Sequence, residues 1–207
     1  MTDLPPTTKP CRTPDEMLGH LPVIEASPKD VGTLTMVVRR PKTERREVLD
    51  VGVLSLETGL VGDNWIERGS SRTPDGSSHP DMQLNVINHR LIEFLSYSDA
   101  ARQALAGDQL HLDLDLSHEN LPAGTRLTFG DPARPDAPAI EVTAQPHTGC
   151  KKFVARFGPE AMKFVNGEHG RPLRLRGLNA KVVVPGEIRP GDQVTVTRPP
   201  SLLDADA

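Results

Sequence analysis

The chain has 207 residues, of which 36% are hydrophobic and 25% are charged, and this size and composition predict one globular domain. Its 28 acidic residues outnumber its 24 lysines and arginines, and the net charge of -4 argues against a nucleic-acid partner. The sequence lacks the run of roughly 20 apolar residues that a membrane span needs, and its start lacks an apolar signal segment. We therefore expect a cytoplasmic protein with no membrane partner.

The two ends of the chain differ in composition from its middle. Residues 1 to 28 hold six prolines and little apolar periodicity, so we predict an irregular, proline-rich N-terminal arm. Residues 199 to 207 are predicted to form a frayed C-terminal tail. The domain itself is placed at residues 29 to 198.

Between these ends, apolar and polar residues alternate over short stretches, a period that is typical of half-buried β-strands. The clearest stretch is 110 to 116, where leucines alternate with His111, Asp113 and Asp115. We predict that the leucines face the interior and that the interleaved residues face water. Other predicted strands cover residues 34–38, 82–86, 126–129, 139–143, 180–184 and 193–197.

Helical patterns are fewer and shorter than the strand patterns. One helix is predicted to start at Asn88 and another at Asp99, because both residue types are good N-caps. A third is predicted from about residue 150 to 157, with Gly158 as its stop and Pro159 opening a further turn. Many short strands with a few short helices predict a mostly β protein, a barrel or a sandwich with helical insertions.

Residues 67 to 80 form a segment rich in serine, glycine and proline that shows no periodicity. A loop of this length inside a compact domain is usually either functional or mobile. Both outcomes are compatible with a lid over a binding site.

Cys150 is the residue with the most informative chemistry. It follows a predicted strand and turn, and it lies where the third helix is expected to begin. Unpaired N–H groups at a helix start, together with Lys151, Lys152 and His147, favour the thiolate, which attacks electrophiles and binds soft metals. The alternative is a small buried cysteine with a structural role.

Two groups of basic residues stand out against the acidic total. Forked guanidinium groups suit a phosphate or a carboxylate, and the spacing of Arg174 and Arg176 is compatible with one strand face. Both groups can equally be solvated charged surfaces. The first group is Arg39, Arg40, Lys42, Arg45 and Arg46, and the second is Arg171, Arg174 and Arg176.

Several common catalytic patterns do not occur in the sequence. The histidines lack the spacing of a metal site, and there is no C-x-x-C pair. The chain has no G-x-S-x-G elbow, Walker A motif or G-x-G-x-x-G motif, which argues against a serine hydrolase, a P-loop NTPase and a Rossmann enzyme.

Five segments of the chain occur in an order that is typical of one protein family. They are GLVGDNW at 59–65, SHENL at 117–121, GTRLTFG at 124–130, IEVTAQPHTGCKKFVARFG at 140–158 and GEIRPGDQVTV at 186–196. With one cysteine in the fourth segment, the chain resembles a MOSC domain, the module found at the C-terminus of molybdenum cofactor sulfurases. The resemblance covers about residues 31 to 198.

This resemblance implies a MOSC-type β-barrel and a site around Cys150, which matches the family cysteine and would serve as catalytic thiol and metal ligand. Members of the family bind the molybdenum cofactor or are proposed to carry sulfur as a cysteine persulfide. Gly62 and Asp63 match the family's early Gly-Asp. The cofactor-binding residues expected from the resemblance and from the basic groups are Glu119, Asn120, His147, Lys152, Arg156, Arg171, Arg174 and Arg176.

The chain also departs from the family pattern near its cysteine. Members commonly have Pro-Arg shortly before the cysteine and proline immediately before it, whereas this chain has Pro146-His147 and Gly149. His118 stands where the family has a glycine before Glu-Asn-Leu. The missing arginine predicts a weaker anion contact at that position.

Three hypotheses about function follow from these features. In the first, Cys150 binds the molybdenum cofactor, arginines hold the pterin phosphate, and the protein reduces N-hydroxylated compounds with electrons from an external donor. In the second, a Cys150 persulfide carries sulfur to a metal-sulfur centre or another acceptor. In the third, the domain is a binding module with a structural cysteine. The resemblance also associates the chain with pyridoxal phosphate binding, but the sequence contains no cysteine desulfurase domain that would form a persulfide with that cofactor.

Overall fold

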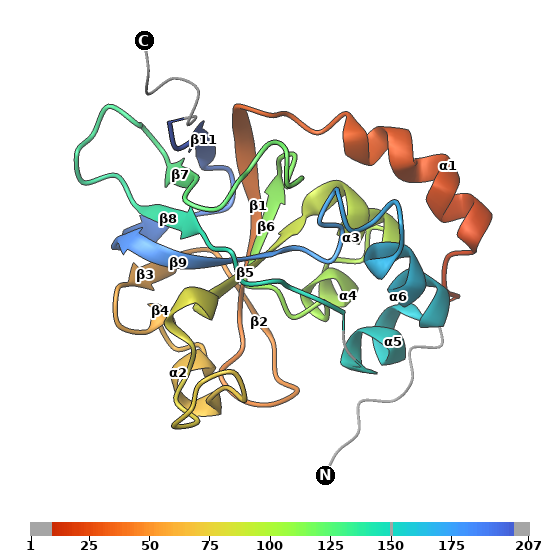
Figure 1. Ribbon diagram of the computed structural model, residues 1–207, viewed down its shortest axis with the longest axis horizontal. Helices are drawn as coiled ribbons and strands as arrows, with labels where there is room; N and C mark the ends of the chain where they lie inside the picture. Colours follow the sequence, from red (N-terminus) through yellow and green to blue (C-terminus); the bar gives the residue numbers. More distant parts are fainter. Residues whose placement is uncertain (1–9, 150, 201–207) are drawn as a thin grey trace.

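The computed structural model describes residues 10–149 and 151–200, and Figure 1 shows its helices and strands. A closed β-barrel forms one part of the molecule, and short helices lie beside it. The elements, in chain order, are α1 (Pro14–Glu25), β1 (Val31–Arg39), β2 (Glu47–Leu49), β3 (Gly52–Ser55), β4 (Gly59–Leu60), α2 (Trp65–Arg68), η1 (Pro80–Met82), β5 (Leu84–Asn88), α3 (His89–Leu95), α4 (Ala100–Ala104), β6 (Leu110–Asp113), β7 (Arg126–Phe129), β8 (Ala139–Val142), α5 (Lys151–Phe157), α6 (Pro159–Asn166), β9 (Leu178–Val184), β10 (Gly186–Ile188) and β11 (Gln193–Thr197).

Seven strands close the barrel in the order β1, β11, β7, β8, β9, β5, β6 and back to β1. Strands β5 and β6 are parallel, and α3 and α4 connect them because a parallel pair needs a crossover connection. Strand β2 extends the sheet from β1, while β10, β3 and β4 form a small second sheet. The predicted mostly β fold, a barrel with a few short helices, is confirmed.

The stretch 110 to 116 confirms one part of its prediction and corrects another. All four of its leucines are buried in the barrel interior, as expected. Strand β6 ends at Asp113, and His111 is fully buried instead of facing water. The reason is that α3 packs against the outer side of β6 and covers this position.

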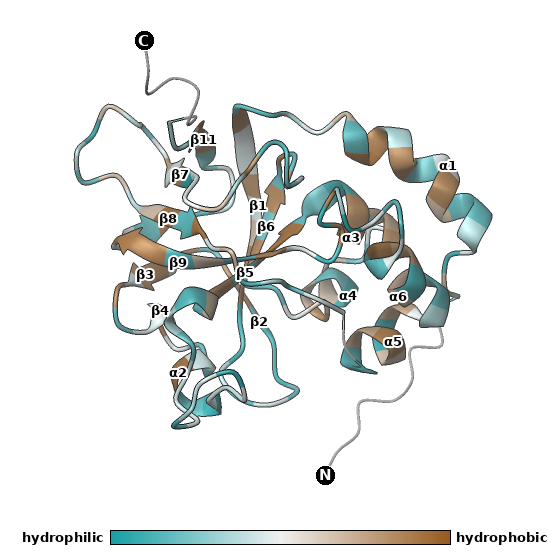
Figure 2. Cartoon of the chain, viewed as in Figure 1, coloured by the Kyte–Doolittle hydropathy of each residue, from teal (hydrophilic) through white to brown (hydrophobic). Residues whose placement is uncertain are grey.

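Helix α1 corrects the prediction that residues 1 to 28 are irregular. The Thr13 hydroxyl accepts a hydrogen bond from the Glu16 N–H at 3.3 Å, and the Glu16 carboxylate accepts one from the Thr13 N–H at 2.8 Å. This capping box satisfies two backbone donors, and Pro14 is tolerated as the first helical residue because no intrahelical partner is lost there. Met17 and Ile24 are buried, and Figure 2 shows apolar and polar residues alternating along α1.

A second hydrophobic core joins the helices to the outer face of the barrel. Helices α3 and α4 begin after Asn88 and Asp99, whose side chains accept hydrogen bonds from the first turn, as predicted. Helix α6 begins at Pro159 after Gly158, which also agrees with the prediction. No helix in the described part of the chain is long and apolar enough to cross a membrane. The core contains Met17, Ile87, Leu91, Phe153, Phe157, Ala161 and Val165.

Candidate functional site

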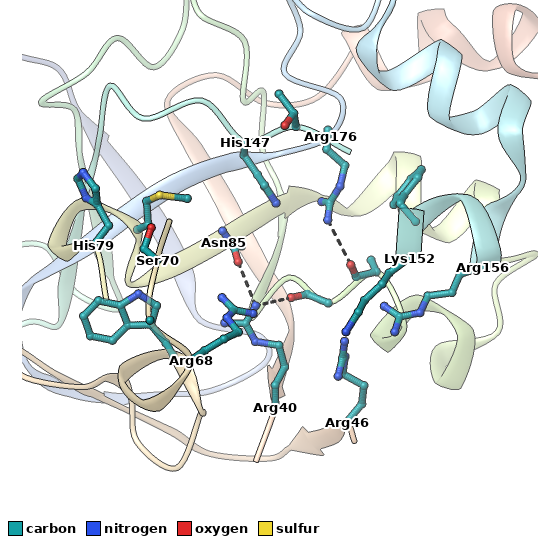
Figure 3. Close-up of a pocket in the computed structure, with 17 residues that line it drawn as sticks. Arg40, Arg46, Arg68, Ser70, His79, Asn85, His147, Lys152, Arg156 and Arg176 are labelled. Atoms are coloured by element: carbon teal, nitrogen blue, oxygen red, sulfur yellow. Dashed lines mark hydrogen bonds between the residues drawn. The ribbon is translucent and has the colours of Figure 1, made fainter. Parts of the chain in front are cut away.

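A cavity of about 240 Å³, here called the first cavity, collects basic side chains from distant parts of the chain. Figure 3 shows Arg46, Lys152 and Arg156 close together, with Arg40 and Arg176 reaching the same space. None of the described residues that line this cavity is acidic. The cationic residues of the lining are Arg40, Arg46, Arg68, Lys152, Arg156 and Arg176.

Arg40, at the end of strand β1, is held rigidly in the wall of the first cavity. Its Nε and Nη2 donate to the two carboxylate oxygens of Asp63 at 2.8 and 2.9 Å, and both side chains are buried. Its Nη1 donates to the Asn85 side chain at 3.0 Å and to the Gly107 carbonyl at 2.9 Å. Asp63, the second residue of the Gly-Asp pair at 62–63, therefore fixes the Arg40 guanidinium.

Arg176 is fixed in a similar way by a carboxylate that has no exposure to solvent. Its Nη1 donates to both oxygens of Asp108, at 2.9 and 2.8 Å. Burial raises the pKa of the Asp108 carboxyl, and the charge of Arg176 opposes that effect. His147 Nδ1 lies 3.4 Å from Asp108 Oδ1. Burial and the neighbouring arginines, Arg176 first among them, hold the pKa of His147 well below its usual range, so this imidazole is neutral.

Three further cations of the first cavity, Arg46, Lys152 and Arg156, lie around the carboxylate of Glu44. The Glu44 carboxylate contacts Lys152 Nζ at 2.7 Å and Arg156 Nη2 at 2.6 Å, and the Lys152 contact lowers the pKa of Glu44. Arg46 lies beside them, and burial together with the charges of Arg156 and Arg40 lowers its pKa to about 10. Its buried Nε has no hydrogen-bond partner in the described part of the molecule. An anion entering here would relieve this repulsion.

A second cavity, of about 440 Å³, adjoins the first one. The two linings share His147, Thr148 and Arg176, so the segment that follows strand β8 forms a common wall. Arg171 and Arg174 line only the second cavity. The prediction that Arg174 and Arg176 share a strand face is wrong, because residues 171–176 form turns and β9 begins at Leu178.

The structure brings some of the predicted site residues together and separates others. His147, Lys152, Arg156 and Arg176 all line the first cavity. Cys150 lies outside the described residues, but Thr148 and Lys152 on either side of it along the chain line that cavity.

Glu119 and Asn120 are not among the described residues that line either cavity. Glu119 is exposed. The buried Asn120 amide donates to the carbonyls of Lys29 at 3.0 Å and Asp115 at 2.7 Å and accepts from Arg198, so it braces three segments. The cofactor role expected for these two residues stays a prediction.

The lining of the first cavity is only partly evident from the amino-acid sequence. Arg40 and Arg46 belonged to a basic group that was equally compatible with a solvated surface, and Arg68 carried no motif. The serine-rich segment at 67–80 was a usable signal, because Arg68, Ser70 and His79 from this segment line the first cavity. Within the described residues, no group of three or more histidine, cysteine, aspartate or glutamate side chains could hold a metal ion.

Comparisons with known proteins bear on the fold. No protein-family profile matches the chain, and no curated protein matches it. The chain is similar to the crystal structure of the YuaD protein from Bacillus subtilis, with a TM-score of 0.58 and 14% identity over 80% of this chain and 95% of that chain. It is also similar to YiiM from Escherichia coli, with a TM-score of 0.50 and 18% identity over 82% of this chain and 71% of that chain. These similarities support a MOSC-like fold.

Proposed function

We propose that this chain is a MOSC-type protein that binds the molybdenum cofactor, with the cofactor phosphate in the first cavity and the Cys150 thiolate as metal ligand. The observation that carries this proposal is the lining of the first cavity, where six cationic side chains meet and none of the described lining residues is acidic. The family motifs and the MOSC-like fold point in the same direction.

The first cavity fits the phosphate group better than it fits a whole cofactor. Its volume of about 240 Å³ lies below the roughly 300–1,000 Å³ of typical organic-ligand pockets. Guanidinium groups bind phosphate through paired hydrogen bonds, and the buried Arg46 Nε is an available donor. Arg46, Lys152 and Arg156 would therefore hold the phosphate, while Arg40 and Arg176 supply fixed positive charge.

The same cations would act on the thiol. Positive charge near a cysteine lowers its pKa and favours the thiolate, the form that ligates a soft metal. The bound cofactor would supply two-electron redox chemistry, and we propose N-hydroxylated compounds as the oxidant with an external protein as electron donor. His147 is neutral, so it would offer one ring N–H donor in the wall of the site.

Metal and pterin analysis tests this proposal directly. Protein made in a host that synthesises the cofactor is expected to contain molybdenum and pterin in near-equal amounts to chain. Cys150→Ser should lose the metal, and Arg46→Gln should lower pterin content, while Cys11→Ser serves as the matched control and should keep both. Wild-type protein from such a host without molybdenum or pterin would contradict the proposal.

A sulfur carrier is the second candidate, because the crowding of cations around Arg46 and Lys152 favours a persulfide anion as much as a thiolate. It predicts that Cys150 gains one sulfur atom in mass, without bound molybdenum, after incubation with a polysulfide. The thiolate attacks the terminal sulfane sulfur of the donor, and the shortened polysulfide leaves as an anion. Cys150→Ser should abolish the gain, and Cys11→Ser should keep it. A gain located on Cys11 would argue against a sulfur carrier at this site.

Both candidates predict an unusually acidic Cys150 thiol. In a Cys11→Ser variant, alkylation by iodoacetamide should proceed readily at about pH 6.5, where an ordinary thiol is roughly 1% ionised. The Cys150→Ser variant, which keeps the exposed Cys11, should be alkylated much more slowly at this pH. If Cys150 of the metal-free protein resists alkylation at every pH, the thiol is structural and both candidates fail.

A further inference from the structure

The second cavity has the size and lining of a site for a small organic ligand. Its volume of about 440 Å³ falls within the roughly 300–1,000 Å³ of typical ligand pockets. Part of the wall is apolar, with Ala144, Pro146, Val165 and Leu178. Another part is cationic, and none of the described residues that line this cavity is acidic.

Arg174 is the cation that distinguishes this cavity. Its Nη1 donates to the Leu121 carbonyl at 2.6 Å and lies 3.5 Å from the Leu116 carbonyl oxygen. Within the described part of the chain, no carboxylate pairs with it. Burial alone lowers the pKa of the Arg174 guanidinium. A partly buried positive charge that rests only on neutral carbonyls leaves room for an anionic partner.

The surroundings of Arg174 do not neutralise its charge. Burial and the charge of Arg174 lower the pKa of His118, which is therefore neutral near pH 7. Arg171, which is exposed, adds a second positive charge to the lining. Arg176 is already engaged by Asp108 and so is less available. Arg174 is thus the best-placed anchor for an anion in this cavity.

The geometry points to a binding site for a small organic acid: we propose that Arg174 holds the carboxylate while Val165, Leu178 and Pro146 contact its apolar body. An apolar wall beside a guanidinium selects an amphipathic anion over an inorganic one, because the wall offers nothing to a fully hydrated ion. The binding of an organic acid in the second cavity does not depend on the proposed function. Any role of that acid as a substrate or sulfur acceptor does rest on the proposed function, because such a role requires the neighbouring first cavity to hold the cofactor or the persulfide.

Benzoate is a suitable probe, because it combines one carboxylate with one apolar ring. We expect benzoate to bind the metal-free protein and to shift the NMR methyl signals of Val165 and Leu178. Arg174→Gln should weaken the binding roughly ten- to a hundredfold, since a charge-assisted hydrogen bond is lost. Arg174→Lys should retain part of the affinity, because it keeps the charge but not the planar fork.

Matched controls separate recognition from folding. Arg126→Gln removes a half-buried arginine of strand β7 that lines neither cavity, and it should leave benzoate affinity unchanged. Benzyl alcohol, the neutral analogue, should bind the wild type more weakly than benzoate does. Its affinity should be the same for Arg174→Gln as for the wild type. A thermal unfolding midpoint near the wild-type value shows that each variant is folded.

Two results would overturn the inference. One is the absence of benzoate binding up to the solubility limit, and the other is binding that Arg174→Gln does not change. A third result would also overturn the inference. If inorganic phosphate displaces benzoate and Arg174→Gln has no effect on benzoate affinity, benzoate lies in the first cavity. Because benzoate binding is measured on the metal-free protein, its result does not depend on whether the cofactor proposal holds.

Discussion

The two cavities share a wall but differ in the groups that their cationic side chains contact. In the first cavity, Arg40 and Arg176 are held by buried carboxylates, and Lys152 and Arg156 share Glu44. In the second, Arg174 rests on backbone carbonyls. Carboxylates fix cations before a ligand arrives, but they also compete with an anionic ligand. The cations of the first cavity are therefore held in place, but they are already paired in part with carboxylates of the protein. In the second cavity, the charge of Arg174 remains available to an anionic ligand.

The largest expected effect concerns the buried pairs of the first cavity. Asp108→Asn leaves the buried Arg176 without a counter-charge, which should lower the free energy of unfolding by about 3–5 kcal/mol. Urea denaturation followed by circular dichroism measures this change. Asp136→Asn is the matched control, because its pair with Arg134 is exposed and screened by solvent, so the free energy of unfolding should change little. Equal losses of unfolding free energy in the two variants would mean that the buried pair contributes no more to stability than the exposed pair.

The dependence of stability on pH tests the burial of His111. Burial, His89 and Arg176 lower the pKa of His111 to about 3, so the folded state keeps it neutral while the unfolded chain protonates it near 6.5. Stability is therefore fully present above about pH 6.5 and falls as the pH drops toward 3. At pH 5 this one histidine should cost about 2 kcal/mol relative to pH 8.

A pair of variants isolates this contribution. His111→Leu should show a loss between pH 8 and pH 5 that is smaller by about 2 kcal/mol than that of the wild type. The exposed His169, changed to Gln, should leave the pH dependence as it is. Stability that is equally sensitive to acid in His111→Leu would show that His111 is not protonated on unfolding in this range.

The smallest expected effect tests whether Glu44 competes with a ligand. Glu44→Gln frees Lys152 and Arg156, so inorganic phosphate should bind about three- to tenfold more tightly, as measured by calorimetry. Glu47→Gln is the control, because its partners Arg39 and Arg45 do not line the cavity, and it should leave phosphate affinity unchanged. Weaker phosphate binding in Glu44→Gln would mean that Glu44 positions the two cations instead of occupying them.

Local features of the fold were predictable because their causes lie within a few residues. Asn88 and Asp99 cap the helices that follow them. The amide oxygen of Asn88 and the carboxylate of Asp99 accept hydrogen bonds from the turn next to them, so each cap depends on local sequence alone. The proline content of the N-terminal arm argues against a helix there, whereas Thr13 and Glu16 carry the capping-box pattern with which α1 begins. His111 was misplaced because alternation specifies two faces of a strand but not whether a helix covers the second one.

The strand periodicity, the helix caps and the presence of basic residues in a chain of net charge -4 follow from the amino-acid sequence alone. Which of those residues meet depends on the folded barrel. The antiparallel pairing of β1 with β11 closes the barrel between the two ends of the domain, and such long-range pairing leaves no mark in a local pattern. Closure brings Arg40, Lys152 and Arg176 to one cavity and leaves Arg174 in the other. Pairing between charges depends on distance in space and on burial, and neither quantity can be read from spacing along the chain.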